Sequence, residues 1–421
     1  MGNIQSMDLG NGIRLHVLKT TKFKTATLNL YIHNNLNRDA SLNALLPAVL
    51  KSASNNFKTP VEISQYLENM YGAVFEADIV KKGEIQSILF YLQFISNEYA
   101  KGDNQLLKAI DLLRDIILNP IVIENGFKSE YVNIEKDKLK ELIKSRVNDK
   151  VQYTVERCIE TVCKDEPFSI YKYGNEKDID SINEKNLYEH YKKVIYGCPI
   201  DIFLAGDYSI DDIAPTIMEK FKITNRNPFE LNNLNINGDV LYKKTVKEKM
   251  DINQGKLCLG YRTGIKSISD SYPALSVYTS ILGGGLHSKL FRNLREKEGL
   301  AYYVYSGLEK FKGLMIINSG IDTNKYDKAI DVIEKQVTEM KNGSISSQEM
   351  DASIKSLKNN LISIKDNVPL MIDYYLGGLL YGRVFSPEEM IDLIQKVDIK
   401  QIIKLGQDIK LDTIYFLSSN E

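Results

Sequence analysis

The layout of one part of the chain recurs about 200 residues later, and this restricts the possible folds more than any other feature of the sequence. The helical stretch IDSINEKNLYEHYKK at 179–193 precedes the apolar segment DIFLAGD, just as DLIQKVDIKQIIKLG at 392–406 precedes TIYFLSS. Another pair, MYGAVFEADIVKKGEIQSILFYL and EGLAYYVYSGLEKFKGLMIINSGI, shares the order helix end, glycine, strand, Lys-Gly turn and strand. A repeat of this length is too long for a solenoid. The sequence therefore predicts two homologous domains.

Each half combines strand patterns with long helical zones. The alternation in residues 26–32 indicates a strand, whereas residues 102–164 and 324–409 are largely helical in pattern. We expect an α+β fold of two homologous domains, each a mostly antiparallel sheet with helices packed mainly on one face, arranged around a cavity. Residues 223–240 are rich in Asn and have no period, which is typical of a linker. The predicted domains are therefore 1–222 and 241–421.

Composition excludes several classes of function. The chain has 54 basic and 55 acidic residues, so its net charge favours neither nucleic acid nor a membrane surface. No apolar run is long enough for a transmembrane helix, and no signal segment opens the sequence. Four scattered cysteines do not form a disulfide framework. We expect a cytoplasmic protein with reduced thiols, and the many Lys, Asn and Ile residues favour a bacterial origin.

The segment LGGGLHSKLFRNLREKEGLAY at 282–302 joins three glycines, an amphipathic helix and the start of a strand. The predicted helix, 286–298, has one apolar stripe, which consists of Leu286, Leu290, Phe291 and Leu294. Arg295 lies off this stripe, and Gly299 suits the left-handed position that ends a helix. Tyr302 then begins the strand. Two donors at one rigid corner can bind a carbonyl oxygen that becomes an oxyanion.

Plainer interpretations of the same residues stay open. Arg295 can be a solvated helix charge, and Tyr302 can be a half-buried strand tyrosine. The glycines are Gly283, Gly284 and Gly285, and no Gly-Lys-Ser/Thr follows them, which argues against a phosphate loop. They either let the helix and loop pack closely, or form a substrate-binding segment or a flexible hinge.

The pattern LGGG-x-x-S-K-L-F-x-x-L-R-E-K-E-G-L-A-Y resembles the C-terminal-domain signature of the pitrilysin/insulinase family of zinc metallopeptidases, in its mitochondrial-processing-peptidase-like branch. The segment LGNGIRLHVL at 9–18 is similar to the opening strand of that family. The resemblance covers essentially the whole chain. It implies that Arg295 and Tyr302 help to bind the substrate backbone and to stabilise the tetrahedral intermediate.

The zinc motif of that family, H-x-x-E-H, is degenerate here. Its two histidines hold Zn²⁺, and its glutamate takes a proton from the metal-bound water. The corresponding helix, ALLPAVL at 44–50, has Ala44 and Ala48 at the histidine positions and Pro47 at the position of the base. The third ligand is expected near Glu141 or Leu142. The chain has four histidines, and they are widely separated: His16, His33, His190 and His287. We therefore expect no metal and no cofactor in this chain.

The resemblance implies a non-catalytic subunit of a heterodimeric zinc metallopeptidase. Arg295 and Tyr302 would contribute substrate binding and transition-state stabilisation, while a zinc-carrying paralogous subunit would be the partner. The substrate would be a peptide, with no nucleic acid and no membrane involved. One alternative is a stand-alone peptide-binding or structural protein of the same fold. A zinc peptidase active by itself is less favoured, because the motif is degenerate.

Overall fold

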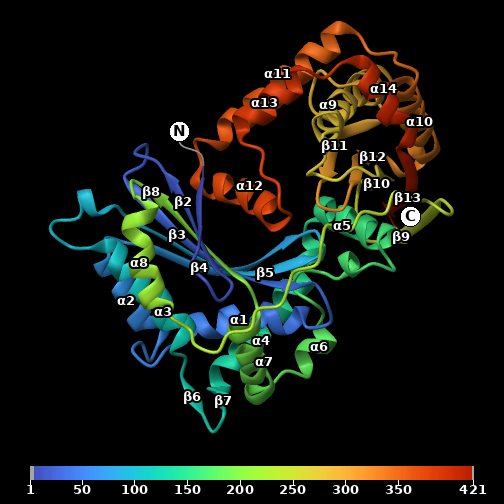
Figure 1. The fold of residues 1–421 in the computed structure, drawn as a ribbon. Helices are drawn as coiled ribbons and strands as arrows, with labels where there is room; N and C mark the ends of the chain where they lie inside the picture. The colour runs from blue at the N-terminus through green and yellow to red at the C-terminus, as the bar shows by residue number, and fades with distance from the viewer. Residues whose placement is uncertain (1–3, 420–421) are drawn as a thin grey trace. The chain divides into compact units, whose positions relative to one another are not determined.

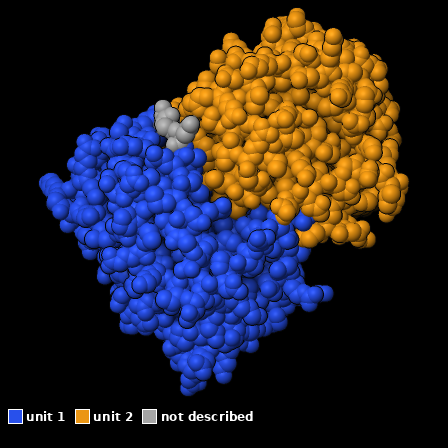
Figure 2. Space-filling model, in the orientation of Figure 1, with its two compact units in different colours: residues 1–145, 170–232 blue, residues 146–169, 233–421 orange. Residues whose placement is uncertain are grey.

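The computed structural model describes residues 4–419, and these form two compact units. One unit contains the residues up to 145 together with 170–232, and the other contains 146–169 together with the residues from 233 onward. Figure 2 colours the two units. No helix or strand lies between Lys220 and Lys244, a stretch that includes the predicted linker. The segment 146–169, which the sequence placed in the first domain, packs with the second unit.

The first unit is built on a six-stranded sheet with the order β1-β2-β8-β3-β5-β4. Its strands are β1 (Gln5–Asp8), β2 (Ile13–Lys19), β3 (Thr25–Asn35), β4 (Val74–Lys82), β5 (Ile85–Ile95) and β8 (Ile200–Gly206). Only β2 and β8 pair in parallel, and the remaining neighbours are antiparallel. The alternation of apolar residues sends Leu28, Leu30 and Ile32 of β3 into the core.

Helices cover the core face of this sheet, as the ribbon in Figure 1 shows. They are α1 (Ala40–Ser52), α2 (Pro60–Asn69), α3 (Gln105–Leu118), α4 (Ser129–Ser145), α6 (Glu176–Asp180), α7 (Glu184–Gly197) and α8 (Ile210–Lys220). A small hairpin of β6 (Val122–Ile123) and β7 (Gly126–Phe127) separates α3 from α4. Side chains of α1, α3 and α7 share one apolar cluster with the sheet, so these helices fix the first unit.

The second unit has a five-stranded sheet with the order β11-β12-β10-β13-β9. Its strands are β9 (Lys244–Lys249), β10 (Gly255–Arg262), β11 (Ala301–Glu309), β12 (Leu314–Ile321) and β13 (Lys410–Ser418). Again one pair, β9 with β13, is parallel, and the others are antiparallel.

The two sheets therefore repeat one topology. The order β2-β8-β3-β5-β4 in the first corresponds strand by strand to β9-β13-β10-β12-β11 in the second, and the parallel pair occupies the same place in both. Strand β1 is an addition to the first sheet. This agreement confirms the predicted α+β fold, in which two similar sheets each carry helices.

The second unit also contains most of the helices of the C-terminal half. They are α9 (Tyr272–Gly283), α10 (Tyr326–Lys341), α11 (Ser347–Ile364), α12 (Val368–Leu380), α13 (Pro387–Gln395) and α14 (Ile399–Asp408), with a π-helix at Phe291–Lys297. One face of the sheet packs on α9, α10 and α14. Short 3₁₀ turns occur at Asn97–Tyr99, Arg146–Asn148, Pro167–Ser169 and Thr323–Lys325.

Helix α5 (Lys150–Val162) covers the opposite face of the second sheet. Cys158 and Val162 of this helix lie so close to β10 that a Cβ at Gly260 would come within 2.7 Å of the Val162 side chain. Buried ion pairs reinforce this packing. Glu166 bonds Arg262 at 2.7 Å and Lys312 at 2.5 Å, and Arg262 also bonds Asp412 at 2.8 Å. These contacts explain why 146–169 belongs to the second unit.

Candidate functional site

Helix α1 forms where the sequence predicted the degenerate zinc helix, and its motif positions share one small pocket. Ala44 and Pro47 are buried, and Ala48 is half-buried. They line a cavity of about 140 Å³ together with residues of β4 and α4. The other lining residues are Ala77, Asp78, Glu135, Lys138, Leu139, Leu142 and Tyr173. The helix therefore presents its motif face to an opening, but with methyl groups and a proline ring.

The polar groups of this pocket are engaged with one another. Asp78 accepts a 2.7 Å hydrogen bond from the Tyr173 hydroxyl, and Glu135 pairs with Lys138 at 2.7 Å. Leu142 lines the pocket, whereas the exposed Glu141 pairs with Lys144 at 3.0 Å. Of the two candidates for the third ligand, Leu142 is thus the one that lines the pocket. Across residues 4–419, no group of three His, Cys, Asp or Glu side chains is placed to hold a metal ion.

The residues around this pocket do not fit a zinc ion. Zinc in peptidases takes three protein ligands, chiefly imidazole nitrogen and carboxylate oxygen. Neither alanine nor proline offers a lone pair to a metal at the motif positions. The pocket lining has two acids, Asp78 and Glu135, and each already has a cationic or phenolic partner.

Two histidines are instead part of a buried structural cluster around Asp201 on β8. His33 Nε2 lies 3.0 Å and His16 Nε2 lies 3.2 Å from the Asp201 carboxylate, and Arg14 bonds the same group through two nitrogens at 2.7 Å. Burial alone would raise the pKa of Asp201, but these hydrogen bonds hold it well below the ordinary range. The carboxylate is therefore ionised and fully bonded, which ties β2, β3 and β8 together.

His190 has a structural role as well. The sequence placed it on a polar helix, yet the side chain is only 5% exposed, because α7 turns it toward α1. Its Nε2 lies 2.7 Å from the side-chain oxygen of Asn43, the residue before Ala44. Asn43 in turn donates to Gln86 at 2.8 Å. A buried polar network thus supports the helix that carries the degenerate motif.

Arg295 lies in an uncommon element. The predicted helix 286–298 begins later than expected, and Phe291–Lys297 is wound as a π-helix. Leu286, assigned to the buried stripe, is 73% exposed, so that assignment was wrong, whereas Leu290 and Leu294 are buried. Leu286 lies in a turn that precedes the first helical residue, 289, so it is not part of the helical face to which the stripe assigned it. π-Helical segments are rare and often occur at functional sites.

Arg295 itself is exposed, and its guanidinium lies 4.8 Å from the centre of the Phe291 ring. The π-helix ends at Lys297, and Gly299 takes the predicted left-handed conformation two residues later, with a φ of +59°. The Leu300 amide then donates to the Leu294 carbonyl at 3.0 Å, a bond that closes the helix end around the glycine. This cation–π contact and capped end orient Arg295 toward solvent near the start of β11.

Tyr302 is the extra residue of a β-bulge on β11. Ala301 pairs with Ile321 and Tyr303 pairs with Gly320, so Tyr302 has no partner across the strands. Bulges re-aim a side chain, and Tyr302 is accordingly 58% exposed. Strand β11 lies at the edge of the sheet. The bulge therefore presents the Tyr302 hydroxyl on the same exposed corner that follows the π-helix.

The three glycines have different roles. A Cβ at Gly283 would lie 2.6 Å from the backbone nitrogen of Ser306, so this buried glycine permits close packing of α9 on β11. Gly284 and Gly285 are exposed, and Gly285 has a φ of +153°. Close packing, one of the two interpretations left open by the sequence, thus applies at Gly283. A hinge or a substrate contact at the other two glycines stays a prediction.

A protein-family model described as the Peptidase M16 inactive domain matches residues 181–357. A curated relative, the probable inactive metalloprotease YmfF of Bacillus subtilis, is 34% identical over 97% of this chain and 96% of its own length. An uncharacterized zinc protease of Mycobacterium leprae is 25% identical over 73% of this chain and 69% of its own.

Solved structures have the same fold. A conserved protein from Enterococcus faecalis superposes with a TM-score of 0.91 and 29% identity, covering 100% of this chain and 99% of that one. A peptidase M16 inactive domain from Pseudomonas fluorescens gives a TM-score of 0.81 at 18% identity, with coverage of 100% and 99%. Within residues 4–419, no helix has the length and apolar character needed to cross a membrane.

Proposed function

The chain belongs to the pitrilysin-like M16 family of metallopeptidases, and on that premise we propose that it is the non-catalytic subunit of a heterodimeric zinc peptidase. Its partner is a paralogous chain with an intact H-x-x-E-H motif, and its substrate is a peptide. In this proposal zinc resides in the partner, and the pair acts in a bacterial cytoplasm.

The observation that carries the proposal is a contrast between two sites in one chain. The metal-binding positions hold Ala44, Pro47 and Ala48, whereas Arg295 and Tyr302 are kept. Moreover, both retained side chains are exposed on elements that cost stability, a π-helix and a β-bulge. A chain that had lost all contact with substrate would have no use for two polar donors on such a corner.

The chemistry divides between the subunits. Zinc in the partner supplies an activated water and polarises the scissile carbonyl. Arg295 and Tyr302 donate hydrogen bonds to the substrate carbonyl and to the oxyanion that develops from it. The Tyr302 hydroxyl keeps its proton at neutral pH, because its hydrogen bond to Asp322 raises the pKa of the phenol. One such donor contributes roughly 2.7–4 kcal/mol to transition-state stabilisation.

A second function, peptide binding without a peptidase partner, has one observation in its favour. Strand β4 is the edge of the first sheet and borders the pocket at Ala44, Pro47 and Ala48 through Ala77 and Asp78. An extended peptide can add to the free edge of a strand by main-chain hydrogen bonds. This second function needs no partner chain, whereas the first requires a zinc-carrying subunit for activity.

Reconstitution with the zinc-carrying M16 paralogue from the same organism tests the proposal. Each chain and the mixture are assayed on a peptide library, and the complex is sized by light scattering. We expect a stable pair, cleavage by the pair that exceeds either chain alone, and about one zinc per pair, located in the paralogue.

Two variants separate a substrate role from a general charge effect. The first is Arg295→Ala, and the matched control is Lys297→Ala, which removes another exposed cation from the same last turn. The proposal requires cleavage to fall in the first variant and to stay near wild type in the second. Tight zinc in this chain alone, or a paralogue whose activity is unchanged by its presence, would contradict it. Peptide binding by the isolated chain without any effect on the paralogue would favour the second function.

A further inference from the structure

A second cavity lies within the second unit, and its lining includes neither the degenerate motif positions nor Arg295 and Tyr302. Its volume is about 200 Å³, and it is bordered by α11, α12, α13 and the segments around 267 and 310. Most of its wall is apolar, with contributions from Phe311, Leu357, Leu361, Phe385, Met390 and Ile394. A well-formed apolar pocket with a few polar groups is the usual form of a small-ligand site.

One polar group inside this pocket lacks a partner. Ser267 is 8% exposed, and its hydroxyl makes no hydrogen bond to the rest of the chain described by the structure. A buried hydroxyl without a partner carries an unfavourable desolvation free energy, so nearly all such groups in proteins are satisfied. The Ser267 hydroxyl lines the cavity and can therefore be satisfied by a ligand.

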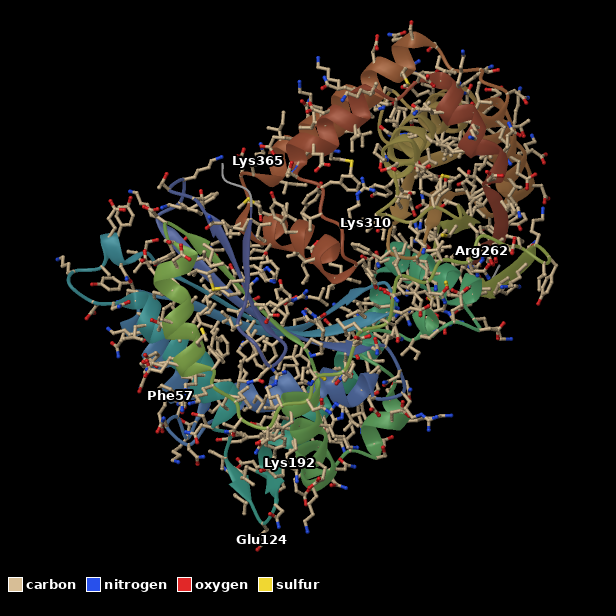
Figure 3. All side chains as sticks on the ribbon, in the orientation of Figure 1. Phe57, Glu124, Lys192, Arg262, Lys310 and Lys365 are labelled. Carbon is tan, nitrogen blue, oxygen red and sulfur yellow. The ribbon has the colours of Figure 1, made fainter. Side chains whose placement is uncertain are left out.

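Two cations border the same cavity, and aromatic rings hold them there. The Lys310 ammonium lies 4.8 Å from the centre of the Phe311 ring and 5.6 Å from that of Tyr374. The Arg383 guanidinium lies 4.3 Å from the centre of the Phe385 ring and pairs with the exposed Asp270 at 2.9 Å. Figure 3 labels Lys310, which directly follows β11. Cation–π contacts fix these charges beside the apolar wall.

Several hydrogen-bond donors line the pocket, and one of them, Arg383, also donates to the Ile268 carbonyl at 2.9 Å. Besides the two cations and the Ser267 hydroxyl, the lining includes Tyr374, whose pKa burial and its neighbours raise above the ordinary phenol range, so this hydroxyl keeps its proton. The carboxylate of Asp270 is exposed and can be exchanged for that of a ligand at Arg383. A ligand that matches this lining has an apolar part and an anionic end that accepts hydrogen bonds.

Glycine on α12 allows the wall to close around such a body. A Cβ at Gly377 would lie 2.1 Å from the tip of the Phe311 ring, so any side chain there would displace the ring. Glycine inside a helix costs about 1 kcal/mol relative to alanine. The position of the Phe311 ring against α12 is therefore maintained at a cost in helix stability.

We propose that this cavity binds an apolar chain or ring that ends in a carboxylate, with the carboxylate at Lys310 and Arg383 and the apolar part against α11 and α13. Two sources have this chemistry: a free medium-chain carboxylic acid, and the C-terminal residue of a peptide that ends in a large apolar side chain. The inference rests on the second unit alone and does not depend on the proposed peptidase partnership.

Isothermal titration of the full chain with sodium decanoate and with decanamide tests the charge requirement. We expect the carboxylate to bind at least about tenfold more tightly than the amide, since hydrogen bonds to charged groups are the stronger ones. An acetylated peptide ending in phenylalanine, as free acid and as amide, identifies the source. Whichever free acid binds more tightly is the ligand class, and the absence of binding by both would overturn the proposal.

Variants place the ligand in this pocket. Lys310→Met keeps the apolar stem and is expected to weaken decanoate binding about tenfold, whereas Lys266→Met, an exposed lysine outside the lining, leaves it unchanged. Ser267→Ala should weaken binding about threefold without lowering the thermal midpoint of the unliganded chain, because the hydroxyl has no partner to lose. Unchanged affinity in both Lys310→Met and Ser267→Ala would contradict the assignment.

Discussion

The Tyr302 hydroxyl donates a 2.8 Å hydrogen bond to the carboxylate of Asp322, which also pairs with Lys325 at 2.8 Å. These groups are exposed to solvent, so the bond contributes little to folding stability. It does hold the phenol ring in one orientation on the corner that follows the π-helix. The bond must be exchanged for a substrate carbonyl if Tyr302 acts as an oxyanion donor.

Replacing Tyr302 by phenylalanine is expected to separate stability from function. The exposed hydroxyl lies on an edge strand, so the thermal midpoint of the chain alone should not fall. Cleavage by the reconstituted pair should fall about 10²-fold, the usual effect of losing one oxyanion donor. The measurements are differential scanning calorimetry of the single chain and peptide hydrolysis by the pair.

Tyr305→Phe is the matched control, since Tyr305 is another partly exposed tyrosine on β11 but lies beyond the bulge. It should leave cleavage within about twofold of wild type, well below the effect of one oxyanion donor. Full activity of Tyr302→Phe would assign the residue a merely local role. So would a stability loss with no separate effect on rate.

Pro47 lies inside α1, and its replacement by alanine is expected to stabilise the first unit. A proline in a helix interior costs about 3 kcal/mol, because it removes an intrahelical hydrogen bond and crowds the preceding turn. Removing two buried methylene groups costs about 1.6 kcal/mol. The balance is a gain of about 1–2 kcal/mol, which urea denaturation measures.

Pro60→Ala is the control for this comparison, because Pro60 is exposed at the first position of α2, where proline is favourable. It should be neutral or slightly destabilising. If Pro47→Ala destabilised the chain instead, the packing of the proline ring would contribute more to stability than the burial of two methylene groups accounts for.

The fold was largely accessible from the sequence because its signals are local and repeated. Alternating apolar residues predict β3, and the capping glycine at 299 predicts the end of the helix before β11. The placement of 146–169 was not accessible. It depends on ion pairs between residues about 100 positions apart, such as Arg262 with Glu166, and single-sequence periodicity carries no such information.

The candidate site was accessible only in part. Spacing singled out Arg295 and Tyr302 as candidates, and the family resemblance supplied the degenerate motif positions, but neither predicted the π winding or the bulge. Leu286 is exposed because the glycines are followed by a turn before the helix begins at residue 289, and the apolar spacing alone did not reveal this late start. The buried position of His190 was also missed, although Leu187 and Val194 place it on the apolar face of α7, because its partner, Asn43, comes from a helix distant in the sequence.

Lowering the pH from 7.5 to 5 is expected to destabilise the first unit through His190. Burial lowers the pKa of this imidazole from its ordinary value of 6.5 to about 4. The unfolded chain therefore binds a proton that the folded chain does not between these two values. The stabilising contribution of the neutral imidazole is fully present above pH 6.5 and is lost as the pH falls toward 4. At pH 5 the free energy of unfolding is lower by about 2 kcal/mol.

His190→Gln isolates this effect, because glutamine can still donate to the Asn43 oxygen but does not titrate. Denaturant unfolding at both pH values measures this. Between pH 7.5 and pH 5, the free energy of unfolding should fall by about 2 kcal/mol less in the variant than in the wild type. Equal pH dependence in the two proteins would mean that the imidazole is protonated in the folded chain.

Glu166 is expected to be a main anchor of the segment 146–169, and Glu166→Gln tests this role. Partial burial would raise the pKa of this carboxyl, but its bonds to Lys312 and Arg262 lower it. Its stabilising charge is therefore present at neutral pH and is lost as the pH falls below about 4.5, the pKa in the unfolded chain.

Arg262 is 4% exposed and Lys312 is fully buried. Removing their shared acid leaves two buried cations undercompensated, which costs about 3 kcal/mol.

The control is Glu334→Gln, which breaks a surface pair with Lys243 in the same unit and should cost less than about 1 kcal/mol. Urea unfolding and limited proteolysis of both variants give the comparison. Because 146–169 is held to the second sheet by these charges and by α5, proteolytic cleavage near 146–169 should accelerate in Glu166→Gln alone. Equal cleavage rates and equal unfolding midpoints in the two variants would show that α5, with its apolar contacts to β10 and β13, holds the segment without help from the ion pairs.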